Sequence, residues 1–191
     1  MKNKKIFTIP NILSVFRILL AILFFDIYIE YGLEIKRTEL ILILCISGLT
    51  DFLDGKIARR FNMISELGKI LDPIADKLTQ CVLLICFLHK YDVAKYVFVV
   101  FLVKEIYMGI AGLKTISVTG KNEGAMWYGK VSTAVFYLVM ILLFCISNIP
   151  EIIAECMLVL CGILMLMSLL LYANYYKKLQ TEAKKTRGEK R

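Results

Sequence analysis

The sequence predicts an all-α integral membrane protein with six transmembrane helices. The chain has 191 residues, a length that one domain accounts for, and 59% of them are hydrophobic. A soluble domain is usually about half apolar. The excess is concentrated in blocks of about 20 residues, which is the length of helix that spans a bilayer. Several of these blocks are interrupted by charged residues, so their exact ends are not sharply defined.

The apolar blocks, in chain order, are 11–30, 39–58, 71–89, 93–115, 127–148 and 151–174. Residues 1–10 precede them as a basic, amphipathic segment that we expect to lie at the membrane surface. Pro10 favours a helix start at this point. Residues 177–191 form a basic tail, expected to be disordered or to lie on the membrane surface. The predicted domain is therefore 11–176.

The basic residues are distributed unevenly between the two ends of the predicted helices. If successive loops alternate sides, 17 of the 24 Lys and Arg residues fall on the side that holds both termini, and 4 fall on the other. This bias predicts that both termini are cytoplasmic. The net charge of +8 then faces anionic lipid headgroups, so we expect membrane lipids and not nucleic acid as the partner of the basic surface.

Four carboxylates interrupt the apolar sequence at helical spacing. Asp51 and Asp54 are three residues apart, and Asp72 and Asp76 are four apart, so each pair shares one face of a helix. The short connection makes the two helices antiparallel neighbours, and the four acids can then converge near the cytoplasmic boundary. Acidic groups at membrane depth are costly and mark a functional site. The purely structural alternative is that the four carboxylates form ion pairs with nearby basic residues, namely Lys56, Arg59, Lys69 and Lys77.

The residue types favour a hard divalent cation at this cluster. Oxygen-only ligands suit Mg²⁺, Mn²⁺ or Ca²⁺, and four carboxylates could hold two such ions against a diphosphate. Gly55, Ala58 and Gly68 leave space for a ligand, and Arg59 can grip a phosphate with two hydrogen bonds. A zinc site is excluded because no Cys-x-x-Cys pair occurs and the chain has one His.

Two alternatives stay open from the residues alone. A cation transporter could use the acids as a relay, but it would spread them through the membrane depth. Arg17, two turns inside the first block, could reach back to the membrane surface or contact a phosphate within the bundle.

The motif resembles the signature of the CDP-alcohol phosphotransferases, Asp-x2-Asp-Gly-x2-Ala-Arg-x8-Gly-x3-Asp-x3-Asp. Its eight fixed positions are all present, at Asp51, Asp54, Gly55, Ala58, Arg59, Gly68, Asp72 and Asp76. The resemblance implies a six-helix homodimeric enzyme of the bacterial cytoplasmic membrane, with its active site facing the cytoplasm. It implies that the four Asp residues hold the metals and that Asp76 is also the general base. Gly55, Ala58, Arg59 and Gly68 would line the nucleotide site.

The stretches 9–17 and 68–77 resemble the family members that use glycerol 3-phosphate and the related members that make cardiolipin, and the first group is the more similar. The resemblance therefore implies transfer of a phosphatidyl group from CDP-diacylglycerol to sn-glycerol 3-phosphate, with release of CMP. Phosphatidylglycerol, an inositol phosphate and serine are the alternative acceptors. Lys104 and Lys114 stand where those members commonly have Arg, and Lys does not reproduce the bidentate fork of Arg. The candidate ligands of the acceptor phosphate are Lys104, Lys114, Lys121, Lys130 and Arg17.

Overall fold

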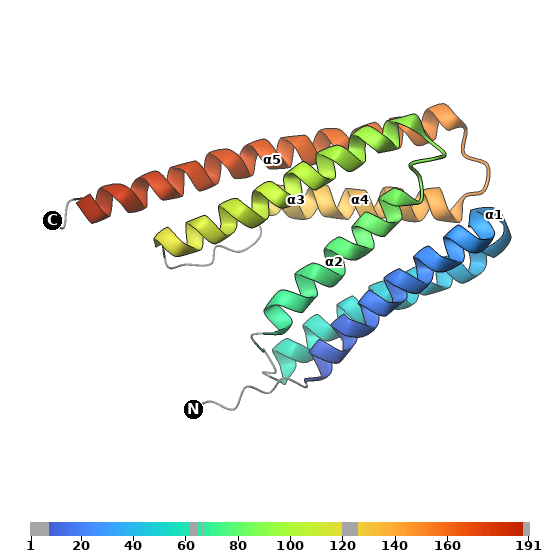
Figure 1. The fold of residues 1–191 in the computed structure, drawn as a ribbon, viewed down its shortest axis with the longest axis horizontal. Coiled ribbons are helices and arrows are strands. Elements are labelled where there is room, and N and C mark those ends of the chain that lie inside the picture. The colour runs from blue at the N-terminus through green and yellow to red at the C-terminus, as the bar shows by residue number, and fades with distance from the viewer. Residues whose placement is uncertain (1–7, 62–64, 66, 120–125, 189–191) are drawn as a thin grey trace. The chain divides into compact units, whose positions relative to one another are not determined.

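The computed structural model describes residues 8–61, 65, 67–119 and 126–188. Within these ranges the chain is helical and contains no strand, which confirms the predicted all-α class. The helices are α1 (Ile9–Arg60), α2 (Gly68–Ile85), α3 (Asp92–Thr119), α4 (Trp127–Cys145) and α5 (Glu151–Gly188) (Figure 1).

The chain divides into two compact units. Unit 1 comprises residues 1–90 and 141–148, and therefore holds α1, α2 and the end of α4. Unit 2 comprises residues 91–140 and 149–191, and holds α3, most of α4 and α5. The four motif carboxylates all belong to unit 1, so this unit can be analysed as a candidate site by itself.

Helix α1 consists of two helical limbs that are separated by a break. The Thr8 side chain caps its start by accepting a hydrogen bond from the Asn11 N–H at 3.4 Å, and Pro10 lies in the first turn. Gly32, at φ 74°, and Lys36 depart from helical geometry. The chain reverses at this break, so the first two predicted blocks form limbs that lie side by side (Figure 1).

Aromatic packing holds the core of unit 1 together. The rings of Phe24 and Phe144 lie edge to face with centroids 5.2 Å apart, and Phe87 packs against Phe144 at 4.8 Å. These three side chains are almost completely buried. Nearby polar groups bond to the backbone: the Tyr28 hydroxyl donates to the Cys86 carbonyl, and Arg37 Nη1 donates to the Phe144 carbonyl at 3.2 Å. This packing joins both limbs of α1 to the residues that follow α2 and to the end of α4.

Unit 2 is built on the contact between α3 and α5, which lie side by side (Figure 1). Helix α4 joins them through Tyr128, whose ring meets that of Tyr172 edge to face at 4.7 Å. The Tyr172 hydroxyl also accepts a hydrogen bond from the Met126 N–H at 2.9 Å. Phe136 and Leu158 are completely buried, so the interior of this unit is apolar as well.

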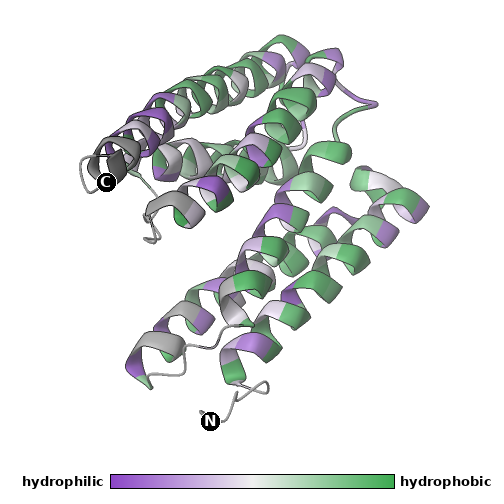
Figure 2. Ribbon diagram, turned by 60° about the vertical axis from the view of Figure 1, so that its left-hand side comes forward, coloured by the Kyte–Doolittle hydropathy of each residue, from purple (hydrophilic) through white to green (hydrophobic). Residues whose placement is uncertain are grey.

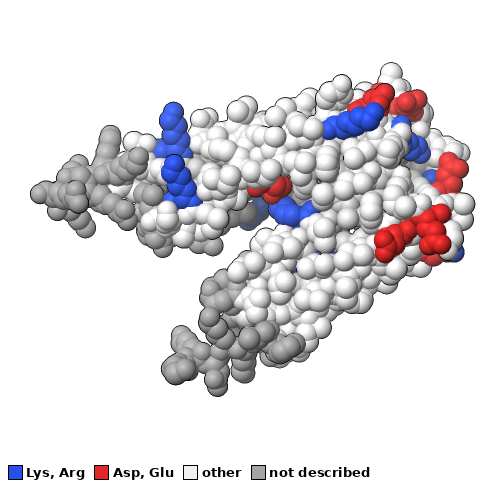
Figure 3. All heavy atoms as spheres, viewed as in Figure 1, with Lys and Arg blue, Asp and Glu red and all other residues white. Residues whose placement is uncertain are grey.

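The outer faces of the helices are apolar too. Large hydrophobic residues such as Leu19, Ile106 and Leu170 are exposed, and hydrophobic colouring predominates along the helices in Figure 2. Most of the face in Figure 3 carries no Lys, Arg, Asp or Glu. Such surfaces suit lipid. Among the described residues, four helices are long and apolar enough to cross a membrane: Ile9–Asp54, Asp92–Ser117, Trp127–Cys145 and Glu151–Ala183.

Two sequence predictions differ from this architecture. The predicted block 71–89 corresponds to α2, whose 18 residues include Asp72, Asp76 and two lysines and which is not among the four apolar helices. The basic tail continues α5 as a helix to Gly188, so its described part is helical and not disordered. A helix that already exists supplies the nucleus for further turns, and the tail extends it.

We expect Gly32→Ala to destabilise the protein by about 1–2 kcal/mol, because an alanine at positive φ is strained. The space around Gly32 is open, so the loss would come from the backbone alone. Thermal unfolding in detergent measures it. Gly48→Ala is the matched control, since Gly48 is helical with nothing within 4 Å of a Cβ. Equal stability of the two variants would show that the break does not depend on glycine.

Candidate active site

The acid motif lies on two helices of unit 1. Asp51 and Asp54 lie on the second limb of α1, and Asp72 and Asp76 lie in the first half of α2. Their environments differ: the side chain of Asp54 is 6% exposed, that of Asp76 is 34% exposed and that of Asp51 is 54% exposed. The site therefore has a buried end at Asp54 and an accessible side at Asp51.

Three of these carboxylates converge on one guanidinium. Arg17 Nη1 donates to Asp51 Oδ1, and Arg17 Nη2 donates to Asp54 Oδ2 at 3.0 Å. The same Nη1 lies 3.9 Å from Asp76 Oδ1. The Arg17 side chain is only 3% exposed, so it does not reach back to the membrane surface. A buried charge of this kind needs partners, and the acid motif supplies them.

The fourth carboxylate is held by a hydroxyl from the same limb as Arg17. Ser14 Oγ contacts Asp72 Oδ1 and lies 2.9 Å from the Pro10 carbonyl oxygen. Ser14 precedes Arg17 by three residues, so both side chains point from one face of the first limb toward the acids. This face therefore contacts all four acids of the motif.

Asn11 extends this polar face by one more turn and contacts the start of α2. The Gly68 N–H donates to Ser65 Oγ at 2.9 Å, and the Ser65 hydroxyl donates to Asn11 Oδ1 at 2.8 Å. A Cβ at Gly68 would lie 2.7 Å from Asn11 Oδ1 and 3.1 Å from Ser65 Oγ. The motif glycine therefore allows a close approach of the Asn11 and Ser65 side chains, which a Cβ at this position would displace.

Sequence reasoning missed Asn11, Ser14 and Ser65 as site residues. A signal for two of them was available, because Asn11, Ser14 and Arg17 recur every three residues in an otherwise apolar block. This polar stripe indicates a helix face that points at other polar groups. Ser65 carries no such pattern, since it lies in a short connection.

Several predicted site residues cannot be placed at the side-chain level. Gly55, Ala58 and Arg59 lie on α1 beyond Asp54, but their side chains fall outside the described part of the structure. Lys121 also lies outside the described residues. Their predicted contacts with nucleotide and acceptor stay predictions.

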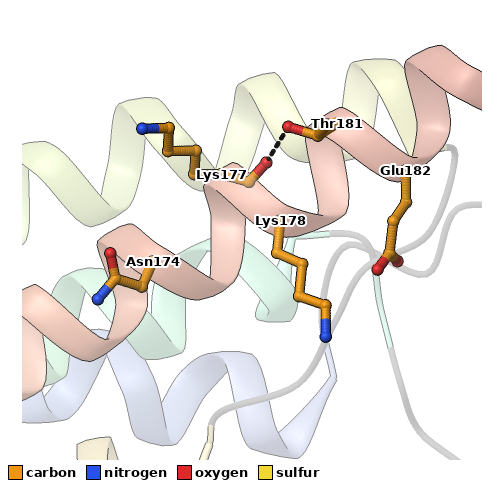
Figure 4. Close-up of a pocket in the computed structure, with 5 residues that line it drawn as sticks. All are labelled: Asn174, Lys177, Lys178, Thr181 and Glu182. Atoms are coloured by element: carbon orange, nitrogen blue, oxygen red, sulfur yellow. Dashed lines mark hydrogen bonds between the residues drawn. The ribbon is translucent and has the colours of Figure 1, made fainter.

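The other candidate lysines belong to unit 2. Lys104 is buried on α3, with its Nζ 2.7 Å from Glu105 Oε1. Lys114 and Lys130 are exposed, on α3 and α4. A surface hollow of about 380 Å³ on α5 is also basic; Figure 4 shows its lining residues, Asn174, Lys177, Lys178, Thr181 and Glu182. Because it contains none of the predicted site residues, we do not include it in the candidate site.

The four carboxylates of the motif are chemically suitable ligands for a divalent ion, but they are not arranged as a metal site in this structure. Asp51, Asp54, Asp72 and Asp76 offer only oxygen ligands, as Mg²⁺ and Mn²⁺ prefer. Among the residues that the structure describes, however, no three His, Cys, Asp or Glu side chains are gathered closely enough to hold a metal ion. Arg17 lies between the acids instead. For three of these carboxylates to hold one metal ion, both the acids and Arg17 would therefore have to move.

Comparison with known proteins identifies a family that the chain matches. Residues 7–174 match the family model described as CDP-alcohol phosphatidyltransferase. A cardiolipin synthase (CMP-forming) of Streptomyces coelicolor is 44% identical over 79 residues, which cover 40% of this chain and 37% of that protein.

Two further relatives carry the name CDP-diacylglycerol–glycerol-3-phosphate 3-phosphatidyltransferase. The protein of Rickettsia bellii is 36% identical over 107 residues, covering 56% of this chain and 57% of its own. That of Blochmanniella floridana is 31% identical over 146 residues, covering 75% and 76%. The chain spans less than two thirds of the length of the Streptomyces and Rickettsia proteins.

We expect Gly68→Ala to lower the free energy of unfolding by about 1–3 kcal/mol, because the added methyl group overpacks the contact with Asn11. Thermal unfolding in detergent measures the loss. Gly109→Ala serves as control, since nothing lies within 4 Å of a Cβ there. The double variant with Asn11→Ala should recover part of the loss. A Gly68→Ala protein as stable as wild type would contradict the close approach.

Proposed function

The chain belongs to the CDP-alcohol phosphatidyltransferase family, and we propose that it transfers a phosphatidyl group from CDP-diacylglycerol to sn-glycerol 3-phosphate. The observation that carries the proposal is the acid motif, which combines the family's residue spacing with three carboxylates around one point of unit 1. The names of the Rickettsia and Blochmanniella relatives support this donor and this acceptor.

Enzymes of this family generally depend on a divalent metal. In our proposal Asp51, Asp54, Asp72 and Asp76 hold two Mg²⁺ or Mn²⁺ ions. Such ions, when bound, neutralise charge on a diphosphate and on the departing phosphate. The accessible side of the cluster, at Asp51 and Asp76, is where the diphosphate would enter. Gly55, Ala58, Arg59 and Gly68 form the proposed nucleotide site.

Asp76 is the proposed general base. Its carboxylate accepts the proton of the acceptor hydroxyl, whose oxygen then bonds to the phosphorus that carries diacylglycerol. The bond from that phosphorus to the bridging oxygen breaks, and CMP leaves with the electron pair. Two observations support Asp76: its side chain is 34% exposed, and its contact with Arg17, at 3.9 Å, is longer than the 3.0 Å contact of the buried Asp54. A base must be reachable by its substrate.

Lysines on the cytoplasmic side supply the proposed acceptor contacts. Lys104 is the strongest candidate, because a buried ammonium in a membrane helix is costly and marks a functional position. Glu105 bonds to it and can orient it. Lys114, Lys121, Lys130 and Arg17 complete the proposed set of acceptor-phosphate ligands.

The membrane arrangement that we propose has six spans, with both termini and the acid motif on the cytoplasmic side of a bacterial cell membrane. The two limbs of α1 account for two spans, and α2, α3, α4 and α5 for the others. The basic loops and tail support this orientation. A homodimer, as the family resemblance implies, is part of the proposal.

An acceptor panel tests the activity. Purified full-length chain with CDP-diacylglycerol, Mn²⁺ and glycerol 3-phosphate should release CMP, and EDTA should abolish the release until metal is restored. Parallel reactions contain phosphatidylglycerol, an inositol phosphate or serine. Faster release with phosphatidylglycerol would reassign the chain to cardiolipin synthesis, the activity named for the Streptomyces relative. Release that is insensitive to EDTA would contradict the metal assignment.

We expect Asp76→Asn to slow CMP release by about 10²–10⁴-fold, because the amide cannot take the proton of the hydroxyl. Asp92→Asn is the matched control: Asp92 bonds to Lys95 at 2.7 Å on the surface of unit 2, and its loss should leave the rate unchanged. Initial rates at saturating substrate measure both. Normal turnover of the Asp76→Asn protein would assign the base to another residue.

A further inference from the structure

Arg17 and the proposed metal ions compete for the same oxygen atoms. Its guanidinium bonds to Asp51 Oδ1 and Asp54 Oδ2, and it lies within ion-pair distance of Asp76 Oδ1. A divalent ion held by these carboxylates would need the same lone pairs and would be repelled by a positive charge at this distance. The present ion pairs and a loaded metal site therefore exclude each other.

We propose that Arg17 is a displaceable counter-cation, which neutralises the acid motif until divalent ions enter and push its guanidinium off Asp51 and Asp54. This inference rests on the proposed metal-binding function of the motif. Arg17 then has a positioning function. Before the metals bind, its guanidinium separates the carboxylate groups and orients them toward the same point.

Three features of the structure suit Arg17 to such an exchange. Its buried Nε has no hydrogen-bond partner among the described residues, so its present position leaves one donor unsatisfied. It comes from the first limb of α1, whereas its partners lie on the second limb and on α2, so it can withdraw independently of the helices that carry the acids. Finally, the side chain of Asp51 is half exposed, which gives an ion access to the pair.

The exchange also explains why an arginine stands here. Unpaired carboxylates this close together would repel one another. A guanidinium can bond to two or three of them at once, and once released it is well suited to bind phosphate. A lysine ammonium at this position would bond to fewer carboxylate oxygens at the same time.

Mn²⁺ binding tests the proposal without any lipid substrate. The full chain in detergent is titrated with Mn²⁺, and the free ion is measured by electron paramagnetic resonance. We expect Arg17→Met to bind Mn²⁺ at least about tenfold more tightly than wild type, because two charge-assisted hydrogen bonds no longer have to be broken. Arg37→Met is the matched control, since Arg37 bonds to a backbone carbonyl of the same unit. Equal or weaker affinity in a folded Arg17→Met protein would overturn the proposal.

A chemical probe on the wild-type chain covers the case in which Arg17→Met fails to fold. Phenylglyoxal modifies accessible arginines, and mass spectrometry of peptides reports each site. Modification of Arg17 should be several-fold faster with Mn²⁺ than with EDTA, whereas that of Arg37 should not change. Equal rates of Arg17 modification with Mn²⁺ and with EDTA would show that the guanidinium stays in place. Tighter Mn²⁺ binding by Arg17→Met would then reflect only the removal of charge repulsion.

The outcomes separate this inference from the proposed function. If wild type binds no Mn²⁺, or if Asp72→Asn leaves its affinity unchanged, the metal site itself is wrong. If wild type binds Mn²⁺ through the motif but Arg17 neither weakens that binding nor becomes accessible, the metal site stands and the displacement is wrong.

Discussion

The ion pairs between Arg17 and the acid motif are the interaction on which the geometry of the site in unit 1 depends. Several carboxylates cannot gather within an apolar bundle unless a positive charge compensates them. Arg17 provides that charge from the opposite limb of α1, and Ser14 holds the remaining acid. The same contacts link the two limbs of α1 with the start of α2, so the polar site adds to the aromatic packing that holds this unit together.

Much of this arrangement could be predicted from the sequence. Block lengths predict helices, and the spacing of Asp51, Asp54, Asp72 and Asp76 places them on facing surfaces, because helical periodicity is a local property. The partners of the acids could not be predicted in this way. Arg17 was open to a surface or a phosphate interpretation, and its true contacts lie 34 and 37 residues away. Pairing over such distances depends on where the chain reverses.

Gly68 shows the same limit of sequence-based prediction at a single residue. A motif glycine next to a nucleotide site suggests space for a ligand. In the structure Asn11 Oδ1 and Ser65 Oγ also lie close to Gly68, so the glycine serves an internal contact as well. Which side chains pack against a small residue depends on distant parts of the chain. The helical periodicity of the sequence carries no information about these long-range contacts.

The reversal at Gly32 also bears on how the chain enters the bilayer during synthesis. A lone Arg or Asp at the centre of a spanning helix costs about 2.5–3.5 kcal/mol on insertion scales. Each limb of α1 carries a charged residue between its centre and its outer end, where this cost is smaller, and the compensating charge lies on the other limb. The hairpin as a whole, and not the single helix, is therefore the smallest segment that can partition from the translocation machinery into lipid with its charges paired.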